Sequence, residues 1–283
     1  RREGEIIEIV ERSHKPFVGV LHIVGRQAWV LMQSRNMPYD ICIDFDTLPE
    51  GAKRGMKVAA LVDGWDKGEP TPKGHIVDVL GMPGENDTEM HAILAEFGLP
   101  YVYPAAVEKA ADKIPAEISA EEIARREDFR GVTTFTIDPK DAKDFDDALS
   151  IRKLKGGLWE VGVHIADVTH YVKEGSVIDK EAEKRATSVY LVDRTIPMLP
   201  ERLCNFICSL RPDEEKLAYS VIFEMNEKAE VKNYRIRHTV IKSNRRFTYE
   251  EAQQIIETGE GDYKEEVLQL NRLAQILREK RMA

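Results

Sequence analysis

The sequence predicts a small antiparallel β-barrel over residues 1–82, an acidic helical connector over residues 83–127 and an α+β domain over residues 128–283. Three observations support this division. The first part alternates apolar and polar residues in short Val- and Ile-rich runs, which is typical of strands. The second part combines helical periodicity with repeated prolines, and the third mixes strand runs with capped helices. A chain of 283 residues is long enough for two domains.

The barrel prediction rests on short segments separated by turns that contain Gly, Pro, Asn or Asp. Five or six such strands within about 80 residues argue for a small antiparallel barrel. The segments span residues 4–12, 17–25, 28–33, 39–45, 57–65 and 74–81.

Aromatic and basic residues are interleaved in these segments, a mixture that suits base stacking beside phosphate contacts. The same residues would also serve as barrel core surrounded by solvated charges, and the sequence leaves both interpretations open. The aromatic residues are Phe17, Trp29, Tyr39, Phe45 and Trp65, and the basic ones are Lys15, Arg26 and Arg35.

The connector region holds the excess acid of the chain, since residues 83–137 carry 5 basic and 11 acidic residues. Pro100, Pro104 and Pro115 separate its helical runs. Ser119, with Glu122 three residues later, forms a capping-box pattern. We expect these helices to pack on the domain that follows, and no pattern in them indicates catalysis.

Strand runs and capped helices alternate in the third part. Strands are expected at residues 132–138, 146–154, 158–168, 217–226 and 229–243, the last two as an antiparallel pair. Ser176 begins a helix that runs to about Thr187, and Thr248 begins another that Gly259 ends. A final helix has no Gly or Pro stop before Ala283, so we expect the chain to be a fragment of a longer protein.

Composition narrows the class of protein. The content of 42% hydrophobic and 32% charged residues is ordinary for a soluble globular chain, and no apolar run approaches the roughly 18 residues of a membrane helix. Cys42, Cys204 and Cys208 are too few for a disulfide framework and lack zinc-site spacing, which predicts reduced thiols in a cytoplasmic protein. The net charge of −9 does not by itself indicate a nucleic-acid binder.

The chemistry is concentrated where five aspartates follow a predicted strand. Carboxylates this close repel one another and raise one another's pKa. A divalent cation relieves that repulsion; Mg²⁺ prefers carboxylate, phosphate and water oxygens, and Mn²⁺ accepts the same ligands. Two such ions roughly 3.5–4 Å apart would flank a phosphodiester and activate water. The aspartates are Asp138, Asp141, Asp144, Asp146 and Asp147.

The aspartates have two other interpretations besides a metal site. An EF-hand calcium loop does not fit, because its ligand and glycine positions are Lys140, Ala142 and Lys143, and its final glutamate position is Leu149. The second interpretation is an acidic solvated turn. Phe145 and the apolar strands on either side argue against a loop that only faces solvent.

Aromatic and imidazole side chains near the aspartates offer further candidates. Tyr190 begins an extended, proline-marked stretch, where an aromatic ring near a phosphate-cleaving site would clamp a base. A packed core tyrosine is the alternative. His164 and His170 are interpreted as core histidines rather than metal ligands.

Four long motifs, in this order, resemble the ribonuclease II and ribonuclease R family, and its bacterial ribonuclease R branch most closely. They read TIDPKDAKDFDDALS, WEVGVHIADVTHYV, SVYLVDRTIPMLPERL and ICSLRPDEEKLAYSV. Residues 128–283 would then be the N-terminal part of the family's catalytic RNB domain. On GVLHIVGRQAWV and PKGHIVDVLG, the preceding barrel resembles the family's cold-shock domain of OB type.

The resemblance implies a magnesium-dependent hydrolytic exoribonuclease that degrades RNA processively from a single-stranded 3′ end to nucleoside 5′-monophosphates. By motif, Asp138 and Asp147 would hold metal, with Asp144 assisting. Asp146 would be the carboxylate most critical for cleavage, and Tyr190 would stack near the scissile end.

Departures from the family's pattern keep alternatives open. The later half of the family's catalytic domain is not in this sequence, so the alternative is that this piece alone is a catalytically incompetent RNA-binding segment. A metal-dependent DNA nuclease is also open, because two-metal chemistry does not depend on the sugar. Within the match, Cys204 and Phe206 stand where the family is expected to have Ser and Gly.

Overall fold

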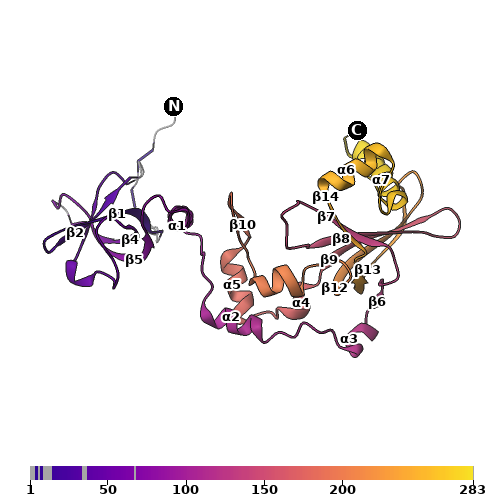
Figure 1. Ribbon diagram of the computed structural model, residues 1–283, viewed down its shortest axis with the longest axis horizontal. Helices are drawn as coiled ribbons and strands as arrows, with labels where there is room; N and C mark the ends of the chain where they lie inside the picture. The colour runs from indigo at the N-terminus through magenta and orange to yellow at the C-terminus, as the bar shows by residue number, and fades with distance from the viewer. Residues whose placement is uncertain (1–3, 6, 9–14, 34–36, 67, 283) are drawn as a thin grey trace. The chain divides into compact units, whose positions relative to one another are not determined.

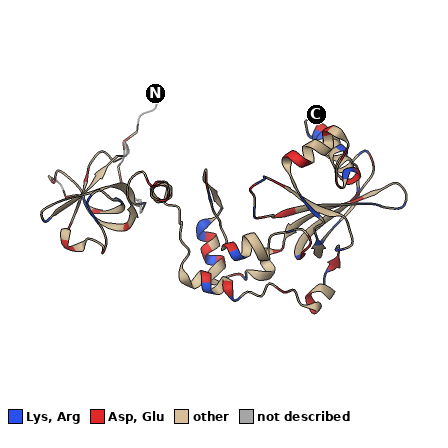
Figure 2. Cartoon of the chain, viewed as in Figure 1, with Lys and Arg blue, Asp and Glu red and all other residues tan. Residues whose placement is uncertain are grey.

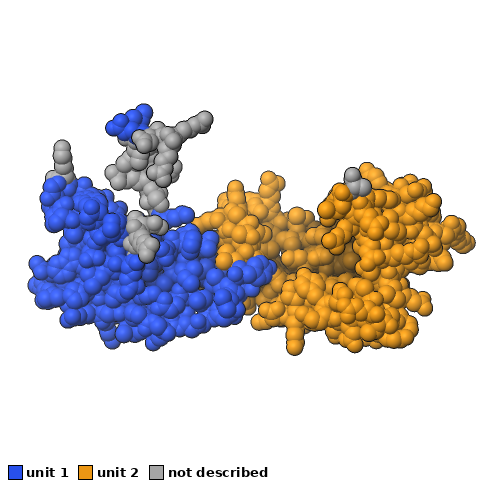
Figure 3. Space-filling view, turned by 90° about the horizontal axis from the view of Figure 1, so that it is seen from above, with its two compact units in different colours: residues 1–103, 190–196 blue, residues 104–189, 197–283 orange. Residues whose placement is uncertain are grey.

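The computed structural model describes residues 4–5, 7–8, 15–33, 37–66 and 68–282, and the chain divides into two compact units (Figure 3). Unit 1 comprises residues 1–103 with residues 190–196, and unit 2 comprises residues 104–189 and 197–283. No helix within the described ranges is long and apolar enough to cross a membrane.

Unit 1 contains a closed five-stranded barrel with the strand order β1-β2-β3-β5-β4 (Figure 1). Fully buried apolar side chains, among them Leu21, Val30, Ile41 and Val58, fill its interior. This confirms the small barrel that the alternating pattern predicts. The strands are β1 (Phe17–Val24), β2 (Gln27–Met32), β3 (Ile41–Ile43), β4 (Lys57–Gly64) and β5 (Lys73–Gly81).

The barrel differs from the all-antiparallel prediction at one pair of strands. Strands β3 and β5 run in parallel, with Cys42 opposite Lys73. A closed barrel of five strands cannot alternate direction all the way round, so at least one neighbouring pair has to be parallel. Strand β3 is also shorter than predicted, because Asp44 begins a 3₁₀ turn over Phe45–Thr47. The strand predicted at residues 4–12 lies largely outside the described residues.

The connector helices are divided between the two units. Helix α1 (Asn86–Glu96) packs on β1, β4 and β5, where Glu89 pairs with Lys57 at 2.5 Å, so the expectation that the connector packs on the following domain is wrong for α1. Helix α2 (Ala105–Asp112) packs on α5 in unit 2, as expected. Ser119 caps the short α3 (Ala120–Ala124) as predicted, because its hydroxyl accepts a hydrogen bond from the Glu122 N–H. The Glu122 side chain pairs with Arg126 at 2.7 Å, and this ion pair is not part of the predicted capping box.

Unit 2 is built on a seven-stranded sheet with the order β14-β7-β8-β9-β12-β13-β6. The outer pairs β14/β7 and β13/β6 are parallel and the inner pairs are antiparallel. The strands are β6 (Glu127–Asp128), β7 (Thr134–Asp138), β8 (Asp147–Lys153), β9 (Trp159–Ala166), β12 (Glu215–Met225), β13 (Val231–Lys242) and β14 (Arg245–Thr248). A hairpin of β10 (Val189–Tyr190) and β11 (Thr195–Ile196) forms a separate two-stranded sheet.

Helices α6 (Tyr249–Thr258) and α7 (Lys264–Met282) cover one face of this sheet (Figure 1). Their apolar side chains pack against Phe135, Ile151 and Val161. Thr248 begins α6 with a complete capping box and Gly259, in the left-handed conformation, ends it, as predicted. The other helices of the unit are α4 (Val168–Tyr171), α5 (Val177–Arg185) and a π-helical segment, η2 (Arg202–Ile207).

Charged residues of both signs lie along α5 and α7 (Figure 2). Helix α5 is capped by Ser176, as predicted, and it ends at Arg185 because Ala186 takes up the left-handed conformation. Interspersed charges of this kind keep a surface soluble without specifying a partner. These charges therefore do not point to a function.

Candidate active site

The segment from Asp138 to Asp147, called here the aspartate loop, joins two adjacent strands of the unit 2 sheet. Asp138 is the last residue of β7 and Asp147 is the first residue of β8. Pro139 ends β7, since it has no backbone N–H to continue the ladder. The two strands are antiparallel neighbours, so both carboxylates lie at the same end of the strand pair.

Backbone hydrogen bonds fix the second half of the aspartate loop. The fully buried hydroxyl of Ser209 accepts a hydrogen bond from the Phe145 N–H at 3.0 Å and donates one to the Lys143 carbonyl at 3.1 Å. The N–H of Leu210 donates to the Phe145 carbonyl at 2.8 Å. On the other side, the N–H of Ala166 in β9 donates to the Asp146 carbonyl at 2.9 Å. The backbone that carries Asp144 and Asp146 is therefore held from two sides.

The carboxylates of the loop act on one another. Burial raises the pKa of Asp138, and the charges of Asp147 and Asp144 raise it further, while the nearby Thr136 and Arg246 oppose the rise. Burial also raises the pKa of Asp146, as do the charges of Asp144, Asp147 and Asp138, even though part of the Asp146 residue reaches solvent. Mutual repulsion of this kind favours either a proton or a cation in the cluster.

The donor set fits a hard divalent cation. The Asp138 side chain is buried, and its Oδ2 atom has no hydrogen-bond partner among the described residues. A buried carboxylate oxygen without a partner is costly unless a cation or water meets it. In the described part of the chain, however, no three His, Cys, Asp or Glu side chains already converge closely enough to hold a metal ion. Cation binding would therefore require the side chains of the loop to draw together.

Tyr190 belongs to unit 1 by its contacts and not to the unit that carries the aspartates. Tyr190 is the last residue of β10 and is 68% exposed. The alternative interpretation, a tyrosine packed in a core, is therefore wrong. The hairpin that carries it is tied to the start of α1, where Arg194 pairs with Asp87 at 2.7 Å and Asn86 donates to Asp193 at 2.6 Å.

The barrel presents part of the aromatic and basic mixture that its sequence suggests. The rings of Tyr39 and Trp65 meet edge to face with centroids 4.7 Å apart, and both residues are exposed. The Arg26 guanidinium lies 5.5 Å from the centroid of the Phe45 ring. Phe17 packs against the barrel core instead, and Arg35 lies outside the described residues. Phe17 and Phe45, which both pack on the barrel core, fit the core interpretation. Base stacking stays a prediction for the exposed Tyr39 and Trp65.

Cys204 and Phe206, where the resemblance leads us to expect Ser and Gly, lie in η2. Burial, and then the charge of Asp144, raises the pKa of the Cys204 thiol to about 12, so the thiol stays protonated and unreactive. Its Sγ atom donates to the Leu199 carbonyl at 3.4 Å. Phe206 is exposed, and the Arg211 guanidinium lies 5.5 Å from its ring centroid. Cys204 therefore adds no second reactive group beside the aspartates.

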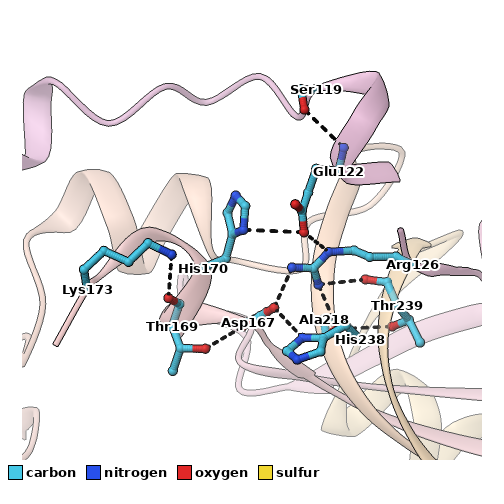
Figure 4. Close-up of polar contacts among 10 residues, drawn as sticks. All are labelled: Ser119, Glu122, Arg126, Asp167, Thr169, His170, Lys173, Ala218, His238 and Thr239. Carbon is cyan, nitrogen blue, oxygen red and sulfur yellow. Dashed lines mark hydrogen bonds and ion pairs between the residues drawn. The ribbon is translucent and has the colours of Figure 1, made fainter. Parts of the chain in front are cut away.

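A buried ionic network supports the end of β9, the strand that holds Asp146 by its backbone (Figure 4). Arg126 pairs with Asp167 at 2.7 Å, and both side chains are almost fully buried. The same guanidinium bonds Glu122, and the Asp167 carboxylate also accepts bonds from Thr169 and His238. Arg126 carries the positive charge that keeps the pKa of Asp167 low despite its burial. Sequence reasoning missed this network, because Arg126 lies 41 positions before Asp167 and 112 positions before His238.

The two histidines differ in their surroundings. His164 is fully buried, as expected, and its ring nitrogens lie 2.7 Å from the Ser220 hydroxyl and 2.8 Å from the Ser150 hydroxyl. Burial lowers its pKa to about 4, so it is neutral at physiological pH. His170 is only half-buried and lies 3.6 Å from Glu122, so the core interpretation is wrong for this residue.

Models of known families match both parts of the chain. A model of the RNB domain matches residues 126–283, more than half of the sequence. The chain belongs to the RNB-domain family. A model of the cold shock domain matches residues 29–104. The expected cold-shock barrel, the expected RNB domain and the resemblance to ribonucleases II and R are thereby confirmed.

Curated relatives extend beyond this chain. It is 38% identical over 285 residues to Ribonuclease R of Thermotoga maritima, an alignment that covers 98% of this chain and 40% of that protein. It is 35% identical over 289 residues to Exosome complex exonuclease RRP44 of Mus musculus, covering 100% of this chain and 30% of that protein. The chain thus spans less than half the length of these RNB-domain relatives.

Solved structures share the fold. Mycoplasma genitalium RNase R in complex with double-stranded RNA matches with a TM-score of 0.87 and 24% identity, over 98% of this chain and 50% of that one. Yeast Ssd1, a pseudonuclease, matches with a TM-score of 0.75 and 22% identity, over 95% of this chain and 34% of that one. Because a pseudonuclease shares the fold, the fold alone does not decide activity.

Proposed function

We propose that the protein to which this chain belongs is a Mg²⁺-dependent exoribonuclease that hydrolyses RNA processively from its 3′ end to nucleoside 5′-monophosphates. The observation that carries the proposal is the aspartate loop, where burial and neighbouring carboxylates raise the pKa of Asp138 and Asp146, and where a buried oxygen of Asp138 has no hydrogen-bond partner among the described residues. The relatives named Ribonuclease R and exosome complex exonuclease support RNA as the substrate. Three free cysteines suit a cytoplasmic site of action.

Within this proposal, Asp138, Asp144 and Asp147 would hold Mg²⁺, and Mn²⁺ would accept the same oxygens. A bound divalent cation supplies positive charge that polarises a phosphodiester and lowers the pKa of water. Asp144 and Asp146 would orient the attacking water and the phosphate from a backbone that Ser209 and Ala166 hold in place. The exposed ring of Tyr190 would stack on a base near the 3′ end of a single strand.

The experiment is turnover of uniformly labelled RNA by the full-length protein. Asp146→Asn should lower the rate of mononucleotide release at least about 10²-fold, because it removes a charge aimed at the reacting group. RNA affinity should stay near the wild-type value, since the amide keeps the size of the carboxylate. Asp141→Asn is the matched control, because Asp141 is an exposed member of the same loop that lies outside the four aspartates assigned above. An Asp146→Asn protein that digests RNA at the wild-type rate would refute the assignment.

A second candidate concerns the chain on its own, as an RNA-binding piece without turnover. The motivation is that it spans 40% of Thermotoga maritima Ribonuclease R and 30% of RRP44. Residues 1–283 should then shift a labelled RNA strand in a gel and release no mononucleotides with Mg²⁺. A DNA strand of the same sequence, offered to the full-length protein in parallel, separates a ribonuclease from a DNA nuclease.

A further inference from the structure

Arg246 lies on the outermost strand beside the start of the aspartate loop. Strand β14 pairs in parallel with β7, and Arg246 is opposite Thr136, two residues before Asp138. Side chains alternate between the two faces along a strand, so Arg246 shares a face with Thr136 and Asp138. Its long side chain extends past the end of β7 and reaches the loop backbone.

The Arg246 guanidinium contacts both halves of the aspartate loop. One of its terminal nitrogens donates to the carbonyls of Pro139 and of Lys140, the latter at 2.9 Å. The guanidinium carbon lies 5.5 Å from the centroid of the ring of Phe145, the residue that precedes Asp146. A planar group with several donors can hold two carbonyls and stack on a ring at once, which a lysine cannot do. One side chain thus bridges the segment that carries Asp141 and Asp144.

Arg246 also places a positive charge among the carboxylates. Its charge opposes the burial that raises the pKa of Asp138. Its Nε–H is buried and has no hydrogen-bond partner among the described residues, as is also true of Asp138 Oδ2. The side chain therefore ties down the loop backbone while leaving the Asp138 oxygen available to a cation.

Resting on the proposed function, we propose that Arg246 is a positioning residue for the metal site: it clamps residues 139, 140 and 145 so that the carboxylates of the aspartate loop can meet one cation. It acts through the shape of the loop and through charge, and is not itself a metal ligand. Groups that orient metal ligands from outside the coordination shell typically change metal affinity or activity about 10–100-fold when removed.

Arg245 supplies a matched control on the opposite face of the same strand. It pairs with Glu251 at 3.1 Å and with Asp262 at 3.4 Å, and its guanidinium lies 5.2 Å from the Phe247 ring centroid. Replacement by methionine thus removes a ring contact and two polar contacts from each arginine; the polar contacts are ion pairs for Arg245 and hydrogen bonds to carbonyls for Arg246. Of the two, Arg246 is the one that bonds the aspartate loop.

The test compares Arg246→Met, Arg246→Lys and Arg245→Met in the full-length protein. Mn²⁺ binding is measured by calorimetry, turnover of labelled RNA gives kcat and KM, and amide hydrogen exchange reports on residues 139–146. Arg246→Met should weaken Mn²⁺ binding about 10-fold or more and lower kcat by about 10–100-fold, with KM within a few-fold and faster exchange in the loop. Arg246→Lys should recover part of each, and Arg245→Met should keep wild-type values.

The outcomes separate this proposal from the proposed function. Wild-type Mn²⁺ affinity and loop exchange in Arg246→Met would overturn the positioning role, and so would equal losses in Arg245→Met. A wild-type protein that binds Mn²⁺ but does not hydrolyse RNA would overturn the proposed function, while the binding and exchange measurements would still decide the role of Arg246.

Discussion

The hydroxyl of Ser209 and the backbone of Phe145 are joined across 64 residues of sequence by a 3.0 Å hydrogen bond inside the protein. The same hydroxyl donates to the carbonyl of Lys143 at 3.1 Å. A single buried side chain thus holds the residues on both sides of Asp144. The precision of the proposed active site depends on this bond as well as on the aspartates.

Replacement of Ser209 by alanine tests that dependence. Ser209→Ala leaves a buried N–H and a carbonyl without their partner, which costs about 1–3 kcal/mol of unfolding free energy. Turnover should fall about 10-fold, because Asp144 and Asp146 lose their fixed backbone. Urea unfolding and RNA hydrolysis measure the two effects. Ser176→Ala removes a helix cap of similar energy on α5 and should leave turnover unchanged; a Ser209→Ala protein with wild-type turnover would show that the loop needs no such support.

The effect of Asp146 on the stability of the folded protein depends on pH. Burial and the neighbouring carboxylates raise its pKa in the folded protein. The folded state then binds the proton more tightly than the unfolded chain, so stability falls as pH rises through the folded pKa. Without divalent ions, Asp146→Asn should therefore raise the Tm at pH 8, and the gain should vanish below about pH 4, where the unfolded carboxyl is protonated. Thermal unfolding with a chelator measures this, and a lower Tm for the variant at pH 8 would contradict it.

His164 gives the stability of the protein the opposite dependence on pH, so that stability falls as pH falls. Its pKa is lowered to about 4 by burial, against an ordinary value of 6.5. As pH falls from 6.5 to 4, the unfolded chain takes up a proton that the folded protein does not, and roughly 3 kcal/mol of stability is lost. His164→Gln should be less stable at pH 7, because the bonds to Ser150 and Ser220 are disturbed, yet it should lack this loss. Urea unfolding between pH 4 and 7 gives the unfolding free energy of the wild type and of His164→Gln as a function of pH. If the two free energies fall in parallel as pH falls, His164 is not the group responsible for the loss.

The Arg126–Asp167 pair should matter through burial of charge. Arg126→Met leaves the Asp167 carboxylate, which is only 2% exposed, without its main cation, and should cost about 3–5 kcal/mol of unfolding free energy. The double variant Arg126→Met with Asp167→Asn should recover part of that loss, since no unpaired charge is left. Chemical denaturation of the wild type, the two single variants and the double variant measures the coupling. An Arg126→Met variant as stable as wild type would mean that His238 and Thr169 suffice to hold Asp167.

Local patterns in the sequence predict much of the fold. The caps at Ser176 and Thr248 and the stop at Gly259 act within one helical turn, so the residues that make them are visible in the sequence. Strand alternation predicts the barrel in the same way. The parallel β14/β7 pair cannot be predicted in this way, because it joins residues more than 100 positions apart and no alternating strand–helix pattern in the sequence indicates it.

The residues of the candidate site likewise fall into those that the sequence reveals and those that only the fold reveals. Asp138, Asp144, Asp146 and Asp147 are recognisable because they are adjacent in sequence and share one chemistry. The residues that hold them, Ser209 and Arg246, come from segments 64 and 107 positions away, and each is an ordinary residue type in an ordinary strand or loop. Only the folded chain brings such supporting residues to the loop.

The most direct test of the central claim is Mn²⁺ titration of the full-length protein, followed by calorimetry, alongside the variants Asp138→Asn and Asp147→Asn. The claim predicts saturable binding by the wild-type protein, binding weakened by 10-fold or more in each variant, and a parallel loss of RNA hydrolysis. Wild-type protein that hydrolyses RNA without binding the ion, or variants that bind it as tightly as wild type, would contradict the claim.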